Sequence, residues 1–232
     1  MSERIAVVTG ATGGIGRDCA QRLSEAGFTC VGLDVQRDET APWASYACDL
    51  ADLAQVEAIC ATIEEAHGLP SVLVNAAGIV THTKFLTATP EDFDRTIAVN
   101  GRGLYFLSQA VAKQMIRAGR GGSIVHFGST GPLIGAGDAP YGMAKAGVHA
   151  LTKSMAQQLG PHGIRVNALA PGLIETPMTA DMPDDMRALY VENVPLRRTG
   201  TPADIGGVVA FLASDDAAYI TGVVLPVNGG VY

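Results

Sequence analysis

The 232-residue chain has no excess of positive charge and no long apolar run, and both absences argue against particular classes of function. Lysine and arginine together number 16 against 23 aspartates and glutamates, so the net charge is −7, which argues against a nucleic-acid-binding surface. No stretch approaches the ~18 consecutive apolar residues of a membrane span. The N-terminus lacks the basic start, long apolar region and small-residue cleavage site of a signal peptide. We therefore expect a cytoplasmic protein that binds neither nucleic acid nor membranes.

Cysteine is also scarce, and the four thiols are Cys19, Cys30, Cys48 and Cys60. No two of them form a C-x-x-C pair and no histidine cluster accompanies them, so we expect neither a metal site nor a disulfide framework. Each stands where an apolar residue would fit. Buried free thiols are therefore the expected state.

What the sequence does contain is a regular alternation of short apolar runs and amphipathic segments. Seven runs predict strands, at residues 5–8, 29–33, 45–48, 72–74, 123–127, 164–169 and 222–227. Most intervening segments carry apolar residues at helical spacing, and some begin with a capping pattern. We predict an α/β fold with one domain over residues 1–232, a doubly wound parallel sheet with helices on both faces. Residues 173–199 lack clean periodicity, although 184–194 could be helical, and are predicted to form a substrate loop or lid.

A glycine-rich turn follows the first predicted strand. Residues 9–16 read TGATGGIG, and a helical pattern begins at Ile15. Glycines let a backbone turn tightly and approach a pyrophosphate, and a helix N-terminus offers free N–H groups to its charge. The spacing is G-x-x-x-G-x-G, and a plain glycine loop is the alternative. The position between a strand and a helix favours nucleotide binding.

Asp34 ends the second predicted strand, where a carboxylate can accept hydrogen bonds from both hydroxyls of an adenosine ribose. A carboxylate there would repel a 2′-phosphate, so the sequence favours NAD over NADP. Arg17 and Arg37 could offset this preference, although each is more simply explained as a solvated side chain. A turn-forming aspartate is the alternative for Asp34. Asp49, which ends the third strand, can contact the adenine amino group, cap the next helix, or do both.

Tyr141 and Lys145 lie four residues apart on a predicted helix and therefore share one face. A neighbouring ammonium favours phenolate and lowers the pKa of tyrosine, which would make Tyr141 a general acid/base. The spacing alone is short and common, and a surface lysine beside a half-buried tyrosine explains it more simply. However, polar residues also follow other predicted strands, among them Asp34 and Ser129, at the sheet edge where ligands bind. This convergence favours the chemical interpretation.

Motifs along nearly the whole chain form a specific set. They are TGATGGIG at 9–16, Asp34, CDL at 48–50, NAAG at 75–78, Asn100 in IAVN, Ser129, YGMAK at 141–145, Pro171-Gly172 with Thr176, and NGG at 228–230. The set resembles the short-chain dehydrogenase/reductase family, including its 3-oxoacyl reductase and dihydrodiol dehydrogenase members. The resemblance implies a seven-stranded Rossmann sheet, a nicotinamide cofactor and an Asn–Ser–Tyr–Lys tetrad. Family members commonly form tetramers, so the helices predicted at 90–118 and 141–159 are candidate faces for a homotetramer or dimer.

The resemblance assigns a catalytic role to each member of the tetrad. Tyr141 would exchange a proton with the substrate oxygen, and Ser129 would donate a hydrogen bond to the same oxygen. Lys145 would lower the pKa of Tyr141 and bind the nicotinamide ribose, while Asn100 would hold a water that links Lys145 to solvent. The cofactor would be bound by Gly10, Thr12, Gly14, Ile15, Gly16, Asp34, Asp49, Leu50, Asn75, Ala76, Ala77, Gly78, Tyr141, Lys145, Pro171, Gly172, Ile174 and Thr176.

Two features depart from the family pattern. NAAG replaces the usual NNAG, so Ala76 lacks one side-chain hydrogen bond. The interval from Ser129 to Tyr141 is one residue shorter than usual, and the usual interval falls on Gly128, which has no hydroxyl. Either the loop is tighter and Ser129 still reaches Tyr141, or the serine has lost its role. The GST sequence after a strand favours the tighter loop.

We interpret the sequence as an NAD(H)-dependent oxidoreductase that interconverts a secondary alcohol and a ketone, with Tyr141 as general acid/base. One alternative is an NADPH-dependent 3-oxoacyl-(acyl carrier protein) reductase. Another is a non-catalytic nucleotide-sensing protein on the same fold, against which the intact tetrad argues. A pocket wall that includes Leu133, Met143, Met178 and Met182 would suit a partly apolar small molecule. His82 and His126 are more simply explained as a loop and a core histidine.

Overall fold

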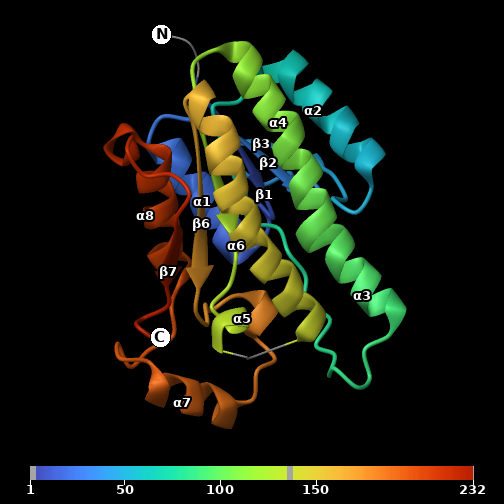
Figure 1. Ribbon diagram of the computed structural model, residues 1–232, viewed down its shortest axis with the longest axis vertical. Coiled ribbons are helices and arrows are strands. Elements are labelled where there is room, and N and C mark those ends of the chain that lie inside the picture. The colour runs from blue at the N-terminus through green and yellow to red at the C-terminus, as the bar shows by residue number, and fades with distance from the viewer. Residues whose placement is uncertain (1–3, 135–137, 232) are drawn as a thin grey trace.

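The structure, a computed structural model that describes residues 4–134 and 138–231, is built on a parallel sheet of seven strands (Figure 1). The strands are β1 (Ile5–Thr9), β2 (Thr29–Asp34), β3 (Ala44–Ala47), β4 (Val72–Asn75), β5 (Gly122–Phe127), β6 (Ile164–Pro171) and β7 (Val224–Val227). Their order across the sheet is β3-β2-β1-β4-β5-β6-β7, and every neighbouring pair is parallel. The predicted fold class is confirmed.

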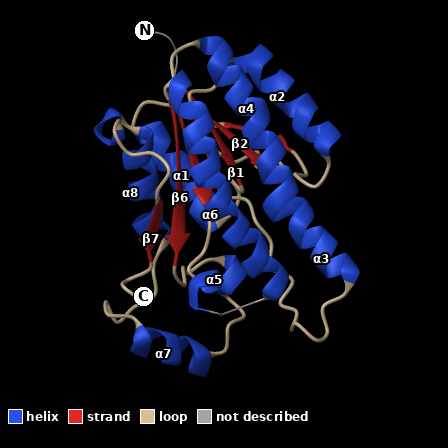
Figure 2. Cartoon of the chain, in the orientation of Figure 1, coloured by secondary structure: helices blue, strands red, loops and turns tan. Residues whose placement is uncertain are grey.

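Helices cover both faces of this sheet (Figure 2). One face carries α2 (Leu53–His67), α4 (Leu104–Ala118) and α6 (Ala139–Leu159), and the other carries α1 (Gly14–Glu25) and α8 (Pro202–Ala213). The central strands are buried on both sides, which explains why they read as continuous apolar runs. Alternate residues of β1 enter opposite cores: Ile5 and Val7 pack on the α2 side, and Ala6 and Val8 pack on the α1 side.

The helix predicted over residues 90–118 is confirmed, but it is not α-helical throughout. It consists of α3 (Pro90–Ile97), a π-helical segment η1 (Ala98–Gly103) and then α4. Gly103 packs so closely on Leu50 that an added Cβ would overlap its carbonyl oxygen. The close approach is a tertiary contact, and π-helical turns of this kind frequently mark functional sites.

The segment after β6 lies at the lower end of the molecule, where it forms α7 (Asp184–Asn193) (Figure 1). It also contains η3 (Pro177–Thr179), and α7 confirms the helix proposed near residue 184. Short elements elsewhere are α5 (Gly131–Ile134), η2 (Gly160–His162) and η4 (Asp215–Ala217). None of the helices in the described ranges combines the length and apolar character that crossing a bilayer requires.

All four cysteines are buried free thiols, as predicted. Burial raises the pKa of Cys48 and of Cys60 to about 11, and it also raises the pKa of Cys19 and of Cys30. A thiol reacts as its thiolate, so these side chains act as small apolar residues of the core.

Candidate active site

A cavity of about 430 Å³ lies at the carboxyl ends of β1, β2 and β4 and is also lined by residues after β3 and β6. Its volume falls within the range of small-molecule and cofactor sites. Most of the predicted cofactor residues line it: Gly10, Thr12, Gly14, Ile15, Gly16, Asp34, Asp49, Leu50, Ala76, Ala77, Gly78 and Thr176. The fold therefore gathers residues that are far apart in the sequence into one pocket.

The glycine-rich turn forms a tight wall of this cavity. Gly10 has a φ of +68°, and an added Cβ there would lie 2.9 Å from the backbone nitrogen of Ala77. At Gly16 an added Cβ would overlap the carbonyl oxygen of Gly10. No side chain caps the N-terminus of α1, so its first N–H groups are free for an anion. These features fit the pyrophosphate of a dinucleotide cofactor.

Asp34 faces the cavity from the end of β2. One carboxylate oxygen accepts hydrogen bonds from the Thr12 backbone N–H at 3.1 Å and the Thr12 hydroxyl at 2.7 Å, and the other accepts from the Val35 N–H at 2.8 Å. Arg17 is paired with Asp38 rather than with Asp34. The predicted counterweight from Arg17 is therefore engaged elsewhere.

Asp49 also lines the cavity, but it does not cap the next helix as one alternative proposed. The N-cap of α2 is Asp52, whose carboxylate accepts from the Ala54 N–H at 2.9 Å. Asp49 instead accepts from the Ala51 N–H at 2.9 Å. The capping prediction is wrong because the helix begins three residues later. Contact between Asp49 and an adenine stays a prediction.

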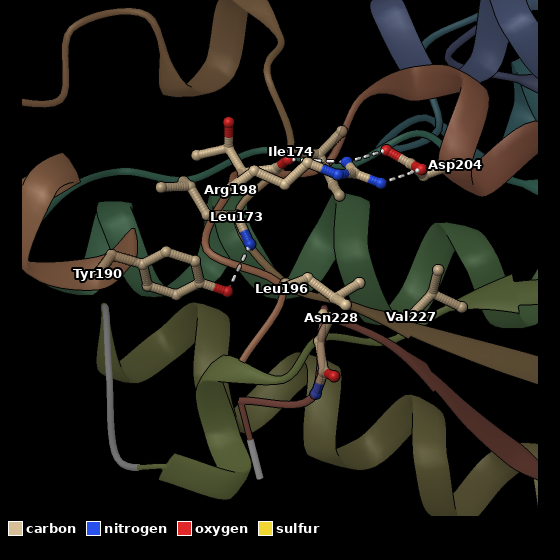
Figure 3. Close-up of a pocket in the computed structure, with 12 residues that line it drawn as sticks. Leu173, Ile174, Tyr190, Leu196, Arg198, Asp204, Val227 and Asn228 are labelled. Atoms are coloured by element: carbon tan, nitrogen blue, oxygen red, sulfur yellow. Dashed lines mark hydrogen bonds and ion pairs between the residues drawn. The ribbon is translucent and has the colours of Figure 1, made fainter. Parts of the chain in front are cut away.

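Some predicted cofactor residues lie outside this lining: Asn75, Tyr141, Lys145, Pro171, Gly172 and Ile174. Asn75 is turned into the protein, where its Nδ2 donates to Ser108 Oγ at 3.0 Å. Gly172 and Ile174 line a separate cavity of about 130 Å³ (Figure 3). Pro171 is the last residue of β6.

Tyr141 and Lys145 lie in the first two turns of α6, which Asp138 caps by accepting from the Tyr141 N–H at 3.0 Å. The buried Lys145 Nζ lies 5.6 Å from the centroid of the Tyr141 ring. The Ser129 side chain lies close enough to Tyr141 to act on the pKa of its phenol. The short interval therefore still leaves Ser129 beside Tyr141, and its catalytic role stays a prediction.

The electrostatics of this cluster differ from the expectation. Burial raises the pKa of Tyr141, and the Ser129 side chain opposes that rise only in part. Burial also lowers the pKa of Lys145 to about 8. The expected lowering of the Tyr141 pKa is not found in this geometry, because burial of the phenol dominates. The Lys145 Nζ donates to the Phe127 carbonyl oxygen at 2.8 Å. Tyr141 is protonated at neutral pH and is thus a proton donor.

Asn100 lies in the π-helical segment and is fully buried. Its side chain accepts from the Ile79 N–H at 2.9 Å and donates to the Ile79 carbonyl oxygen at 2.8 Å. An added Cβ on Gly78 would lie 3.2 Å from Asn100 Oδ1 and 3.4 Å from Lys145 Nζ. Gly78 is also part of the cavity lining, so it joins the cavity to the lysine. The water relay through Asn100 stays a prediction.

Sequence reasoning missed several residues of the site. Asp138 accepts from the Thr81 hydroxyl at 2.6 Å and the Thr83 N–H at 3.1 Å, which ties the loop after β4 to the start of α6. Arg95 and Val99 line the cavity, and their helical spacing of four was a usable signal. His149 accepts a hydrogen bond from the Ser129 N–H, for which the sequence offered no signal.

The segment predicted to form a lid is anchored at both ends, as Figure 3 shows. The hydroxyl of Tyr190 on α7 accepts from the Leu173 N–H at 2.9 Å, just beyond the end of β6. Two guanidinium nitrogens of Arg198 donate to the two carboxylate oxygens of Asp204, each at 2.7 Å, at the start of α8. Bidentate pairs of this kind fix geometry as well as charge.

The expected apolar substrate wall is only partly placed. Met178 lines the large cavity, whereas Met143 is 52% exposed. The side chain of Leu133, which was also expected in this wall, lies outside the described residues. His82 is an exposed loop residue with a φ of +56°, and His126 is fully buried, so both histidine predictions are confirmed.

Comparisons with known proteins agree with this geometry. The family profile described as Enoyl-(Acyl carrier protein) reductase matches residues 10–232. The 3-oxoacyl-[acyl-carrier-protein] reductase FabG of Vibrio harveyi is 40% identical over 238 residues, covering 99% of this chain and 97% of that protein. The (3R)-3-hydroxyacyl-CoA dehydrogenase of Mus musculus is 38% identical over 248 residues, covering 98% and 96%.

Solved structures show the same similarity. A short-chain type dehydrogenase/reductase from Mycobacterium marinum superposes with a TM-score of 0.93 at 31% identity, covering 99% of this chain and 96% of that one. The aldohexose dehydrogenase of Thermoplasma acidophilum superposes with a TM-score of 0.92 at 33% identity, covering 99% and 94%.

Proposed function

Because the chain belongs to the short-chain dehydrogenase/reductase family, we propose that it is an NAD(H)-dependent oxidoreductase that interconverts a secondary alcohol and a ketone. The family shares nicotinamide cofactors, and its named members here act on CH–OH groups or the matching ketones. The observation that carries the proposal is the place of Gly78, which lines the cavity of about 430 Å³ and lies beside Lys145, the lysine next to Tyr141.

In the reductive direction the cluster performs the proton transfer. The hydroxyls of Tyr141 and Ser129 donate hydrogen bonds to the substrate carbonyl oxygen and stabilise the negative charge that develops on it. A nicotinamide bound in the cavity would supply the hydride that the carbonyl carbon receives. Tyr141 then gives its proton to the oxygen, which completes the alcohol, and the phenol is reprotonated from solvent past Lys145. Oxidation runs through the same steps in reverse.

Asp34 supports the preference for NAD. Its carboxylate lines the cavity at the end of β2, where a ribose 2′-phosphate would place a second negative charge. Asp49 lines the same cavity, and the single basic residue of the described lining is Arg95 on α3. The charge of this lining therefore favours ribose hydroxyls over a phosphate.

A second candidate is an NADPH-dependent 3-oxoacyl-(acyl carrier protein) reductase. It is favoured by two relatives of similar length, one named a 3-oxoacyl-[acyl-carrier-protein] reductase and the other a (3R)-3-hydroxyacyl-CoA dehydrogenase. The two candidates share the proton-transfer cluster and differ in cofactor and in the size of the substrate. The placement of Ser129 and Lys145 beside Tyr141 supports either one over a nucleotide sensor.

The decisive experiment measures kcat/KM with NADH and with NADPH against acetoacetyl-CoA and a panel of simple and cyclic ketones, followed by NADH or NADPH absorbance. We expect NADH to be preferred by roughly tenfold or more, the size of one charge repulsion of about 1.4 kcal/mol. A clear NADPH preference with acetoacetyl-CoA as the best substrate would establish the second candidate. No turnover with any pair would support nucleotide sensing.

We also propose that the protein is a homo-oligomer. Aromatic and aliphatic side chains on α3 and α4 stay exposed, among them Phe93, Tyr105, Phe106 and Ile116. Exposed apolar patches mark interaction sites in folded proteins. Light scattering after size-exclusion chromatography would measure the mass in solution. We expect the mass of a tetramer or dimer, and the mass of a monomer would contradict the proposal.

A further inference from the structure

Ser129 lies just beyond β5, where the chain leaves the sheet and enters the active-site loop. On one side of this extended stretch, the N–H groups of Gly128 and Thr130 donate to the Leu169 and Pro171 carbonyl oxygens of β6, at 2.8 and 3.0 Å. The Ser129 N–H between them points to the other side, where the pairing of β4 with β5 has already ended at Asn75. This partly buried N–H therefore needs an acceptor from outside the sheet.

His149 supplies that acceptor from α6. Its Nε2 accepts from the Ser129 N–H at 3.4 Å. The histidine lies one turn beyond Lys145 and two turns beyond Tyr141, so all three share one helix face. Its ring also fills the space beside Gly128, because an added Cβ at Gly128 would overlap Nε2 and Cδ2. The glycine and the histidine therefore fit as a pair.

We propose that His149 is a positioning residue that holds Ser129 against Tyr141, and that it does so only as a neutral imidazole. The proposal deepens the proposed function and rests on it, since it concerns the serine that would bind the substrate oxygen. Gly128 is part of this arrangement, because only a residue without a side chain leaves room for the His149 ring to reach the backbone. The hydrogen bond from the Ser129 N–H to His149 on α6 thus holds Ser129 in position although the loop is short.

The charge state follows from the hydrogen bond. Nε2 can accept only when its lone pair is free, which places the single ring proton on Nδ1. Burial, followed by the charges of Lys145 and Lys153, lowers the pKa of His149. Gly128 and Ser129, which lie against the ring, carry no charge, and the pKa of His126 on β5 is lowered to about 3. Acid would convert the acceptor into a donor that opposes the Ser129 N–H.

The main test compares His149→Leu with His149→Gln, because the glutamine Oε1 can replace Nε2 as an acceptor that does not titrate. We expect His149→Leu to lower kcat roughly tenfold, the loss of one hydrogen bond to the machinery, with the Kd for NADH within about twofold of wild type. His149→Gln should recover most of kcat and lose less activity than wild type between about pH 7.5 and 5.5. His162→Gln, an exposed histidine, is the control.

A double-mutant cycle tests the pairing of the ring with Gly128. Gly128→Ala should lower the unfolding midpoint in the wild-type background but much less in His149→Ala, where the overlapping ring is gone. Equal losses in both backgrounds would contradict the packing part of the proposal. The cycle reads stability alone, so it does not depend on the substrate.

Tyr141→Phe distinguishes a failure of the proposed function from a failure of the role proposed for His149. If it keeps wild-type activity, the proposed function fails. If it is inactive while His149→Leu keeps wild-type kcat, or while His149→Gln shows the same acid loss as wild type, then only the role of His149 is overturned. A His149→Leu protein that fails to fold leaves His149→Gln to decide.

Discussion

The ammonium of Lys145 donates a 2.8 Å hydrogen bond to the carbonyl oxygen of Phe127, the last residue of β5. This bond joins the strand that leads into the Ser129 loop to the helix that carries Tyr141. The lysine is buried, and burial lowers its pKa to about 8. Lys145 is therefore charged at neutral pH. It holds α6 to the end of β5 in addition to any part that it takes in proton transfer.

Lys145→Met should remove a pH dependence of stability that wild type shows at high pH. The folded pKa of about 8 lies below the ordinary 10.5, so between these values the unfolded chain binds the proton that the folded chain has lost. Stability should rise with pH across this window, by about 3 kcal/mol in total. Urea unfolding at about pH 7, 8 and 10 measures it. Identical slopes in variant and wild type would argue against the shift.

His126 should make the protein sensitive to acid. Burial, with a smaller effect of Lys145, lowers its pKa from 6.5 to about 3, and its ring nitrogens meet Ser108 Oγ and Thr152 Oγ1. Below pH 6.5 the unfolded chain binds the extra proton, so stability falls as pH falls, by about 2 kcal/mol between pH 7.5 and 5.

The comparison uses His126→Gln, which keeps polar groups near both hydroxyls and cannot titrate. Its loss of stability between about pH 7.5 and 5 should be smaller than that of wild type. The exposed His162, changed to Gln, should behave as wild type. If His126→Gln and wild type lose stability in parallel, another group causes the acid sensitivity.

Asp34→Ser should change the cofactor preference. Removal of the carboxylate takes away the repulsion of a 2′-phosphate and leaves a hydroxyl that can bind one. We expect the ratio of kcat/KM for NADPH over NADH to rise about tenfold or more. Glu39→Gln removes an exposed charge a few residues away and should leave the ratio unchanged. An unchanged ratio in Asp34→Ser would mean that another group selects the cofactor.

Tyr190→Phe should loosen the lid. The variant loses the acceptor of the Leu173 N–H but keeps the ring. A hydrogen bond contributes a net 0.5–1.5 kcal/mol, so the KM for the substrate should rise by roughly two- to tenfold. Tyr219→Phe is the matched control, because Tyr219 is fully exposed. Equal KM values for the two variants would show that this contact does not hold the lid.

Much of the fold could be predicted because its signals are local. Buried parallel strands require continuous apolar runs, and the capping boxes at Thr89 and Thr201 are fixed by residues three apart. The glycine turn and Asp34 were found because each has a defined place after a strand. These features need no knowledge of distant neighbours.

The remaining features depend on tertiary contacts that cannot be inferred from the sequence alone. The π-helical break near Asn100 accompanies the packing of Gly103 on Leu50. The direction of the Tyr141 pKa depends on how deeply the phenol is buried. His149 can be recognised only after the sheet shows which N–H group has no strand partner. In each case the cause is tertiary.

The central claim, that Tyr141 transfers the proton in an NADH-linked reduction, is tested most directly by Tyr141→Phe. Single-turnover oxidation of bound NADH should be slowed by about 10²–10⁴-fold with the best ketone found for wild type, while the Kd for NADH and the unfolding midpoint stay within error of wild type. A phenylalanine variant that oxidises NADH at the wild-type rate would contradict the account.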